Sequence, residues 1–166
     1  MMNTFRPHRR AARAFALRGT TVAAFGAALL IALVPFAAQA QADPALAAAA
    51  KEAGAVVTPS GLVYRSLKDG SGASPTAADS VKVHYRGTVP DGREFDSSYK
   101  RNEAAQFPLG GVIPCWTEGV QKMKVGGKAR LTCPASIAYG SRGAGGSIPP
   151  NATLHFEVEL LEIAKR

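Results

Sequence analysis

The residues of this sequence that are best suited to chemistry are aromatic. No serine lies in a nucleophile-elbow pattern, and no group of His, Cys, Asp and Glu has metal-ligand spacing. The sequence therefore predicts neither a metal nor a cofactor. The glycine-rich run GSRGAGGS at 140–147 lacks the strand-to-helix context of a phosphate loop, so we interpret it as a mobile surface loop.

Six aromatic residues stand out over residues 85–156: Tyr85, Phe95, Phe107, Trp116, Tyr139 and Phe156. A domain of this size needs several buried aromatic side chains, so the simplest expectation is a hydrophobic core. Two details favour a binding surface for some of them. Asp96 follows Phe95 directly and Arg101 lies five residues further on, and a carboxylate buried among rings needs such a partner. Tyr139 borders a loop rich in Gly and Pro, where side chains line surfaces.

The elements that must position these residues are mostly strands. Period-two alternation predicts strands at 61–70, 81–87, 94–96, 128–134 and 152–163. The inward positions are Val81, Val83, Tyr85, Ala129, Leu131, Cys133, Leu154, Phe156, Val158 and Leu160. His84 and His155 fall on the outward faces, where we expect them to be solvated.

One segment, residues 114–127, has the period of a helix instead. Trp116, Val120 and Met123 are spaced i, i+4 and i+7, which places them on one helix face. Pro114 suits the first turn, and Gly126 with Gly127 ends the run. One amphipathic helix among several strands favours an α+β fold, with a twisted antiparallel sheet closed over the helix.

The N-terminal 40 residues have the features of a cleaved secretory signal peptide. A region with five arginines and no acid precedes the apolar run 22–36, and Ala38-Gln39-Ala40 forms a small-x-small cleavage site. The alternative is an uncleaved membrane anchor, but the apolar run is short for the roughly 20 residues of a spanning helix. We expect an exported protein, periplasmic or secreted after cleavage.

Removal of the signal peptide would lower the net charge of the chain. Because the five arginines lie before residue 41, the formal charge falls from +8 to +3, and the basic balance of the whole chain implies no nucleic-acid partner. We interpret residues 41–57 as an alanine-rich lead, either a loose helix or a tether, and place the folded domain at 58–166.

The two cysteines allow two interpretations. Cys115 begins the expected helix and Cys133 faces inward on the next strand, so both could be unpaired buried residues. In an exported protein with only two cysteines we favour a disulfide between them.

The segment from about Gly61 to Ile163 resembles an FKBP-type peptidyl-prolyl cis-trans isomerase of the exported bacterial type. The resemblance rests on VHYRG, DGREFDSS, VIPCW, EGVQKMKVGGKA, AYG and IPPNATLHFEVEL, which occur in the family's order. It implies a half-open antiparallel sheet of five or six strands wrapped around one short helix.

The resemblance also implies a pocket for a prolyl ring. Trp116 matches its floor, Tyr85, Phe95 and Phe156 match its aromatic walls, and Phe107 matches a residue of the inner wall.

Further positions match the polar groups and the rim. Val112 and Ile113 match the rim, where the backbone N–H of Ile113 would hold the substrate chain. Asp96 matches the polar residue that faces the isomerising amide, with Arg101 as its ion partner, and Tyr139 matches the hydroxyl donor at the mouth. The residues implied to be catalytic are Tyr85, Phe95, Asp96 and Tyr139.

The overhanging loop contributes Ile148, but the rim departs from the family pattern. Ala105 stands where family members often carry an aromatic residue, and Ala144 and Ser147 stand where bulkier residues are common. These departures leave the floor intact and predict weaker binding of macrolide inhibitors of the FKBP type.

The function implied is a peptidyl-prolyl isomerase that helps exported proteins to fold. Its expected partners are unfolded or partly folded proteins that contain proline. The alternative is a binding or chaperone module whose pocket captures such chains with little turnover.

Overall fold

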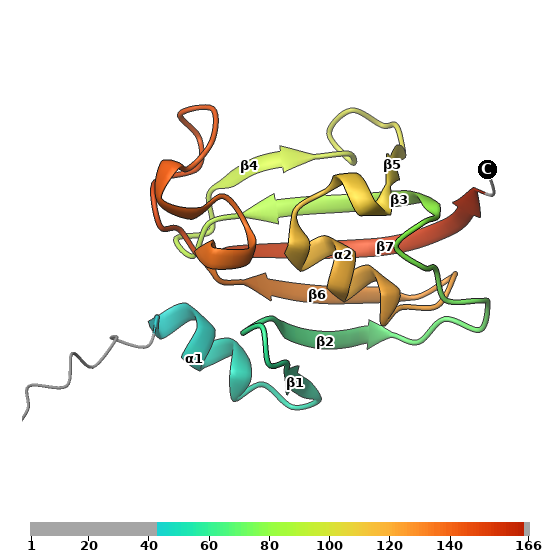
Figure 1. Ribbon diagram of the computed structural model, residues 1–166, viewed down its shortest axis with the longest axis horizontal. Helices are drawn as coiled ribbons and strands as arrows, with labels where there is room; N and C mark the ends of the chain where they lie inside the picture. The colour runs from blue at the N-terminus through green and yellow to red at the C-terminus, as the bar shows by residue number, and fades with distance from the viewer. Residues whose placement is uncertain (1–42, 165–166) are drawn as a thin grey trace, which may run out of the picture. The chain divides into compact units, whose positions relative to one another are not determined.

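The computed structural model describes residues 43–164, so the expected signal peptide lies outside the described residues. No helix within residues 43–164 is long and apolar enough to cross a membrane. The described chain forms one antiparallel sheet with a helix, α2, packed on one of its faces (Figure 1).

The sheet contains seven strands within the described residues, in the order β1-β2-β6-β7-β3-β4, with β5 also paired to β3. The strands are β1 (Ala55–Val57), β2 (Val63–Lys68), β3 (Ser80–Thr88), β4 (Glu94–Ser97), β5 (Ala105–Pro108), β6 (Lys128–Cys133) and β7 (Leu154–Ala164). Two helices, α1 (Pro44–Ala50) and α2 (Pro114–Gln121), and the 3₁₀ turns Leu109–Gly111, Ala135–Ile137 and Gly140–Arg142 complete the described part. The α+β architecture expected from the alternation is confirmed.

The core follows the predicted faces of the strands. All ten predicted inward residues of the three long strands are buried, and so are Trp116, Val120 and Met123. The helix itself ends at Gln121, five residues before the glycines that were expected to end it. Met123 therefore reaches the core from the turn that follows α2.

The segment before residue 58 is more structured than a tether. Asp43 caps α1 by accepting a hydrogen bond from the backbone N–H of Ala45 at 2.8 Å, and its carboxylate also accepts one from Thr153. After the helix, Glu52 pairs with Arg65 and Arg130, which lie on the face of the sheet opposite α2. The strand β1 then pairs with β2, so α1 and β1 belong to the same compact unit as the sheet.

His84 and His155 are less exposed than predicted. His155 is half-buried, and its Nδ1 lies 2.9 Å from Thr132 Oγ1. Burial and the nearby Arg130 hold the pKa of His155 below its ordinary value. His84 stacks on Tyr99 with ring centroids 4.9 Å apart, and its Nδ1 lies 3.0 Å from Ser98 Oγ.

One edge of β3 carries two successive partners. Residues 80–83 of β3 pair with β5, and residues 86–88 pair with β4. Between these ladders Ser98 takes over the pairing, since its N–H donates to Tyr85 O at 3.0 Å and its Oγ accepts from Tyr85 N at 2.8 Å. Tyr85 is thus fixed at the point where the edge changes partner.

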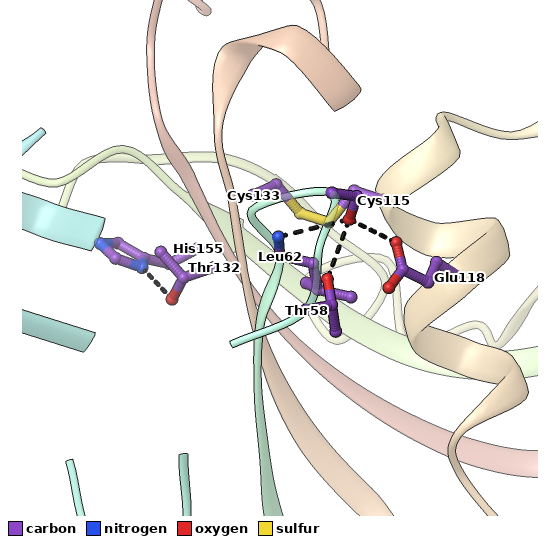
Figure 2. Close-up of a disulfide and its surroundings, with 8 residues drawn as sticks. Thr58, Leu62, Cys115, Glu118, Thr132, Cys133 and His155 are labelled. Carbon is purple, nitrogen blue, oxygen red and sulfur yellow. Dashed lines mark hydrogen bonds between the residues drawn. A yellow bond between two sulfur atoms is a disulfide. The ribbon is translucent and has the colours of Figure 1, made fainter. Parts of the chain in front are cut away.

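The predicted disulfide between Cys115 and Cys133 is confirmed, with Cα atoms 5.8 Å apart. It joins the first turn of α2 to the end of β6, and both cysteines are fully buried. Figure 2 shows the loop from Thr58 to Leu62 alongside it, facing Glu118 of α2. In that loop Ser60 Oγ donates to Glu118 Oε2 at 2.5 Å and lies 2.9 Å from Thr58 Oγ1. The bridge and this hydrogen bond both hold the first five residues of α2.

Opening the disulfide is expected to destabilise the domain. The cysteines are 18 residues apart in sequence, and a bridge closing a loop of this length stabilises by about 3 kcal/mol through the unfolded chain. The double substitution Cys115→Ala/Cys133→Ala should therefore lower the urea midpoint substantially. Dithiothreitol should lower the wild-type midpoint similarly and leave that of the double variant unchanged. Equal midpoints for the oxidised wild type and the double variant would contradict this expectation.

Candidate functional site

A cavity of about 340 Å³ lies beside α2 and gathers most of the predicted site residues. Nine of them line it, together with Gly111, which the sequence did not predict: Tyr85, Phe95, Asp96, Phe107, Val112, Ile113, Trp116, Tyr139 and Phe156. They come from β3, β4, β5, α2, β7 and the connections between them. Residues up to 71 positions apart in the chain thus share one site.

The centre of the lining is the indole of Trp116, which is 4% exposed. Three other rings meet it edge to face: Tyr85 at 5.2 Å between centroids, Phe156 at 5.4 Å and Phe107 at 5.8 Å. Edge-to-face pairs at such distances are favourable beyond the area they bury. The indole Nε1 is buried and has no hydrogen-bond partner among the described residues.

A second aromatic contact completes the wall. Phe95 meets Phe156 edge to face at 5.6 Å. The two rings lie over Gly87 of β3, because a Cβ at that position would be 2.5 Å from Phe95 Cζ and 3.1 Å from Phe156 Cε1. Any side chain at residue 87 would therefore displace this wall of the cavity.

The polar side of the cavity is formed by Tyr85, Asp96 and Arg101. The Tyr85 hydroxyl donates to Asp96 Oδ2 and accepts from Arg101 Nη2 at 3.1 Å, while Arg101 Nη1 donates to Asp96 Oδ1 at 2.5 Å. The guanidinium also lies 5.7 Å from the centroid of the Tyr85 ring. Arg101 is not part of the lining, so it acts on the cavity through the two side chains that it holds.

This arrangement fixes the charge state of the site. Partial burial tends to raise the pKa of Asp96, but hydrogen bonds from Tyr85 and Arg101 outweigh it and hold the pKa below its ordinary value. Burial, followed by the hydrogen bond to Asp96, raises the pKa of Tyr85. Burial and the charge of Asp96 also raise the pKa of Tyr139. Near neutral pH the site therefore holds one carboxylate and two neutral hydroxyls.

Other lining residues form the rim and the mouth of the cavity, whereas the predicted residue Ile148 lies outside the lining. Gly111, Val112 and Ile113 form the rim before α2, and the backbone N–H of Ile113 donates to no other described residue. Tyr139 is 39% exposed, as a residue at a mouth would be. Ile148 is 7% exposed and belongs to the core cluster, so the structure does not place it in the lining.

A larger hollow of about 610 Å³ lies between α1 and the sheet face opposite α2. Its lining contains no Phe, Tyr or Trp among the described residues, and its charged side chains are already paired. Arg130 bonds Glu52 and Glu157, and Arg86 bonds Glu94. The aromatic cavity is therefore the better candidate for a functional site.

Gly87→Ala is expected to destabilise the domain by about 1–3 kcal/mol, because the added methyl group overpacks the contact between Phe95 and Phe156. Urea denaturation measures this loss. In the double variant Gly87→Ala/Phe95→Leu the smaller side chain gives room to the methyl group, so the loss should be less than the sum of the single losses. Additive losses would show that the methyl group does not meet the Phe95 ring.

Known proteins of one family are similar to this chain in sequence. The profile of the family described as FKBP-type peptidyl-prolyl cis-trans isomerase matches residues 72–161. The chain is 58% identical over 120 residues to the FKBP-type peptidyl-prolyl cis-trans isomerase FkpA of Aeromonas hydrophila, covering 72% of this chain and 44% of that protein.

Two solved structures are similar in fold as well as in sequence. The crystal structure of FkpA from Escherichia coli superposes with a TM-score of 0.69 at 48% identity, covering 71% of this chain and 55% of that one. A peptidyl-prolyl cis-trans isomerase of Pseudomonas syringae pv. tomato gives 0.68 at 36% identity, covering 73% and 89%. The chain spans about half the length of the two FkpA proteins. From its profile match, its sequence identities and its fold, the chain belongs to the FKBP-type peptidyl-prolyl cis-trans isomerase family.

Proposed function

We propose that this protein is a peptidyl-prolyl cis-trans isomerase that acts at the aromatic cavity. The observation that carries the proposal is the packing of three rings against Trp116, which forms an apolar floor beside a single hydrogen-bonded carboxylate. Family membership and the identity to relatives named as isomerases support it.

Such a cavity suits a reaction that breaks no covalent bond. The barrier to rotation about a peptide bond is about 18–20 kcal/mol, because a twisted amide loses the resonance of the planar one. An apolar wall disfavours the more polar planar amide relative to the twisted form, and binding energy from the prolyl ring can hold the twist. Shortening tens of seconds to milliseconds takes about 10⁴-fold, or roughly 5.5 kcal/mol.

Each part of the lining has a role in this proposal. The prolyl ring rests on Trp116 between the rings of Tyr85, Phe95 and Phe156, with Phe107 on the inner side. Burying an apolar ring against such a floor supplies the binding energy for the twist.

The polar groups around the cavity orient the substrate chain. The unpaired N–H of Ile113 donates to a substrate carbonyl, with Val112 beside it on the rim. The Tyr139 hydroxyl donates at the mouth. Asp96 either faces the isomerising amide or serves to anchor Arg101, and a substitution at Asp96 distinguishes these roles.

We also propose that the protein works outside the cytoplasm as a folding helper. The arginine-rich start, the apolar run and the small-residue site in residues 1–40 support export, as does the disulfide, which persists in oxidising compartments. Prolyl isomerisation limits the folding of many chains. The proposed substrates are therefore unfolded or partly folded exported proteins that contain proline.

One observation favours a second candidate, a binding module that captures proline-containing chains with little turnover. Neither Ala105 nor Ile148 lines the cavity, so its rim is lower than the resemblance implied. A low rim leaves the prolyl ring more accessible to water, which weakens the preference for a twisted amide. The same low rim is expected to weaken the binding of macrolide inhibitors.

Residues 41–166 should accelerate the cis-to-trans relaxation of a short X–Pro peptide. Phe95→Ala should lose most of this acceleration, because it removes a wall of the cavity. Asp96→Ala should lower kcat/KM strongly if the carboxylate faces the amide, and only slightly if it anchors Arg101. A folded wild type that relaxes the peptide at the background rate, yet binds it, would establish the binding module instead.

The pH profile gives a separate test of the site. The pKa of Asp96 is lowered and those of Tyr85 and Tyr139 are raised, so kcat/KM should be constant between about pH 5.5 and 8.5. Because the pKa of Asp96 is lower in the folded state, its contribution to stability is present above its unfolded value of about 3.9 and is lost on further acidification. An inflection of kcat/KM near neutral pH would contradict this assignment.

A further inference from the structure

The rim of the cavity is a short connection with few bonds of its own. It runs from Leu109 through Gly111 and Val112 to Ile113, and it consists of one 3₁₀ turn followed by two extended residues. At its start Leu109 is fully buried and its N–H donates to Asp79 O at 2.9 Å. At its end Ile113 is the N-cap of α2 and supplies no side-chain cap.

Both ends of this rim are bonded to a single residue of α2, Thr117. The Thr117 hydroxyl donates to Leu109 O at 2.8 Å, and the Thr117 backbone N–H donates to Ile113 O at 3.2 Å. The unpaired N–H of Ile113 lies within the segment that these two bonds close. The hydroxyl bond therefore ties the start of the rim to the same helical turn that holds its end.

The residue type at position 117 also fits this role. Threonine is a poor choice for a helix interior, where its hydroxyl usually turns back to the carbonyl four residues earlier. Here that carbonyl belongs to Ile113, yet the hydroxyl reaches eight residues back to Leu109. Helix propensity does not explain this threonine, whereas the link between rim and helix does.

We infer that Thr117 is a positioning residue for substrate binding: its hydroxyl holds the rim so that the Ile113 N–H meets the substrate carbonyl. This inference rests on the proposed function. Without the hydroxyl, Leu109 stays buried but its carbonyl loses the bond to α2, so the start of the rim is free to shift and the Ile113 donor is held less firmly. The aromatic floor and walls stay where they are, since Thr117 does not line the cavity.

Removal of the Thr117 hydroxyl should therefore weaken substrate binding and leave the turnover rate nearly unchanged. Thr117→Val, which keeps the branched shape and removes the hydroxyl, should raise KM about five- to tenfold, the loss typical of one hydrogen bond, with kcat changed less than about twofold. Thr117→Ser, which restores the hydroxyl, should return KM to within about twofold of the wild-type value.

A matched control comes from the next turn of the same helix. Gln121 Nε2 donates to Thr117 O at 2.6 Å, a bond within the helix that does not reach the rim. Gln121→Met removes this bond and should leave KM unchanged. This control distinguishes a general destabilisation of α2 from a displacement of the rim. Thermal melting shows whether each variant is folded, and Thr117→Ala takes the place of Thr117→Val if that variant is not.

A binding measurement makes the test independent of catalysis. A proline-containing tetrapeptide is titrated into ¹⁵N-labelled protein, and the amide signal of Ile113 is followed. The signal should shift in the wild type and in Thr117→Ser, and should need about five- to tenfold more peptide in Thr117→Val.

The possible outcomes distinguish the positioning role of Thr117 from the proposed isomerase activity. A wild-type KM and a wild-type titration for Thr117→Val would overturn the positioning role, and so would a loss confined to kcat. A wild type without isomerase activity would overturn the proposed reaction, while the titration would still decide whether Thr117 positions the Ile113 donor.

Discussion

The whole site depends on how closely the short helix α2 can approach the sheet. At Gly119 a Cβ would lie 2.7 Å from Leu131 Cδ2, so the glycine allows a contact that a larger residue would prevent. The disulfide between Cys115 and Cys133 fastens the beginning of the helix to β6. At this separation Trp116 reaches rings carried by three different strands. An eight-residue helix has little stability of its own, so these contacts, rather than its propensity, hold the floor of the cavity.

The cavity combines an apolar floor with one charged group whose state is fixed. Asp96 is ionised, but both of its oxygens are occupied by Tyr85 and Arg101. A free carboxylate would draw water into the cavity and favour the planar, more polar amide. In the proposed reaction, the bonds from Tyr85 and Arg101 keep this charge at the wall, beside the apolar floor. The unpaired donor at Ile113 lies on the rim instead, where substrate backbone is expected.

The sequence was sufficient for those features that repeat locally. Alternation along β3, β6 and β7 predicted their buried faces, and the spacing of Trp116 and Val120 predicted the buried face of α2. Features that depend on contacts between residues far apart in sequence have no such local pattern. The lead before residue 58 has few bulky apolar residues, and it is held by the β1–β2 ladder and by polar contacts of Glu52 and Asp43 with residues distant in sequence. The clearance above Gly87 and the bond from Thr117 to Leu109 likewise depend on residues that meet only in the folded chain.

The position of β7 has a consequence for the order of folding. This strand is the last of the described strands in sequence, yet it lies in the interior of the sheet between β6 and β3. Until it is inserted, the two halves of the sheet have no common neighbour, and Phe156 is missing from the wall of the cavity. Pairings between residues so far apart in sequence form slowly, since a long loop must close first. The cavity is therefore completed only when β7 has been inserted, and the proposed binding of a prolyl ring depends on this late step.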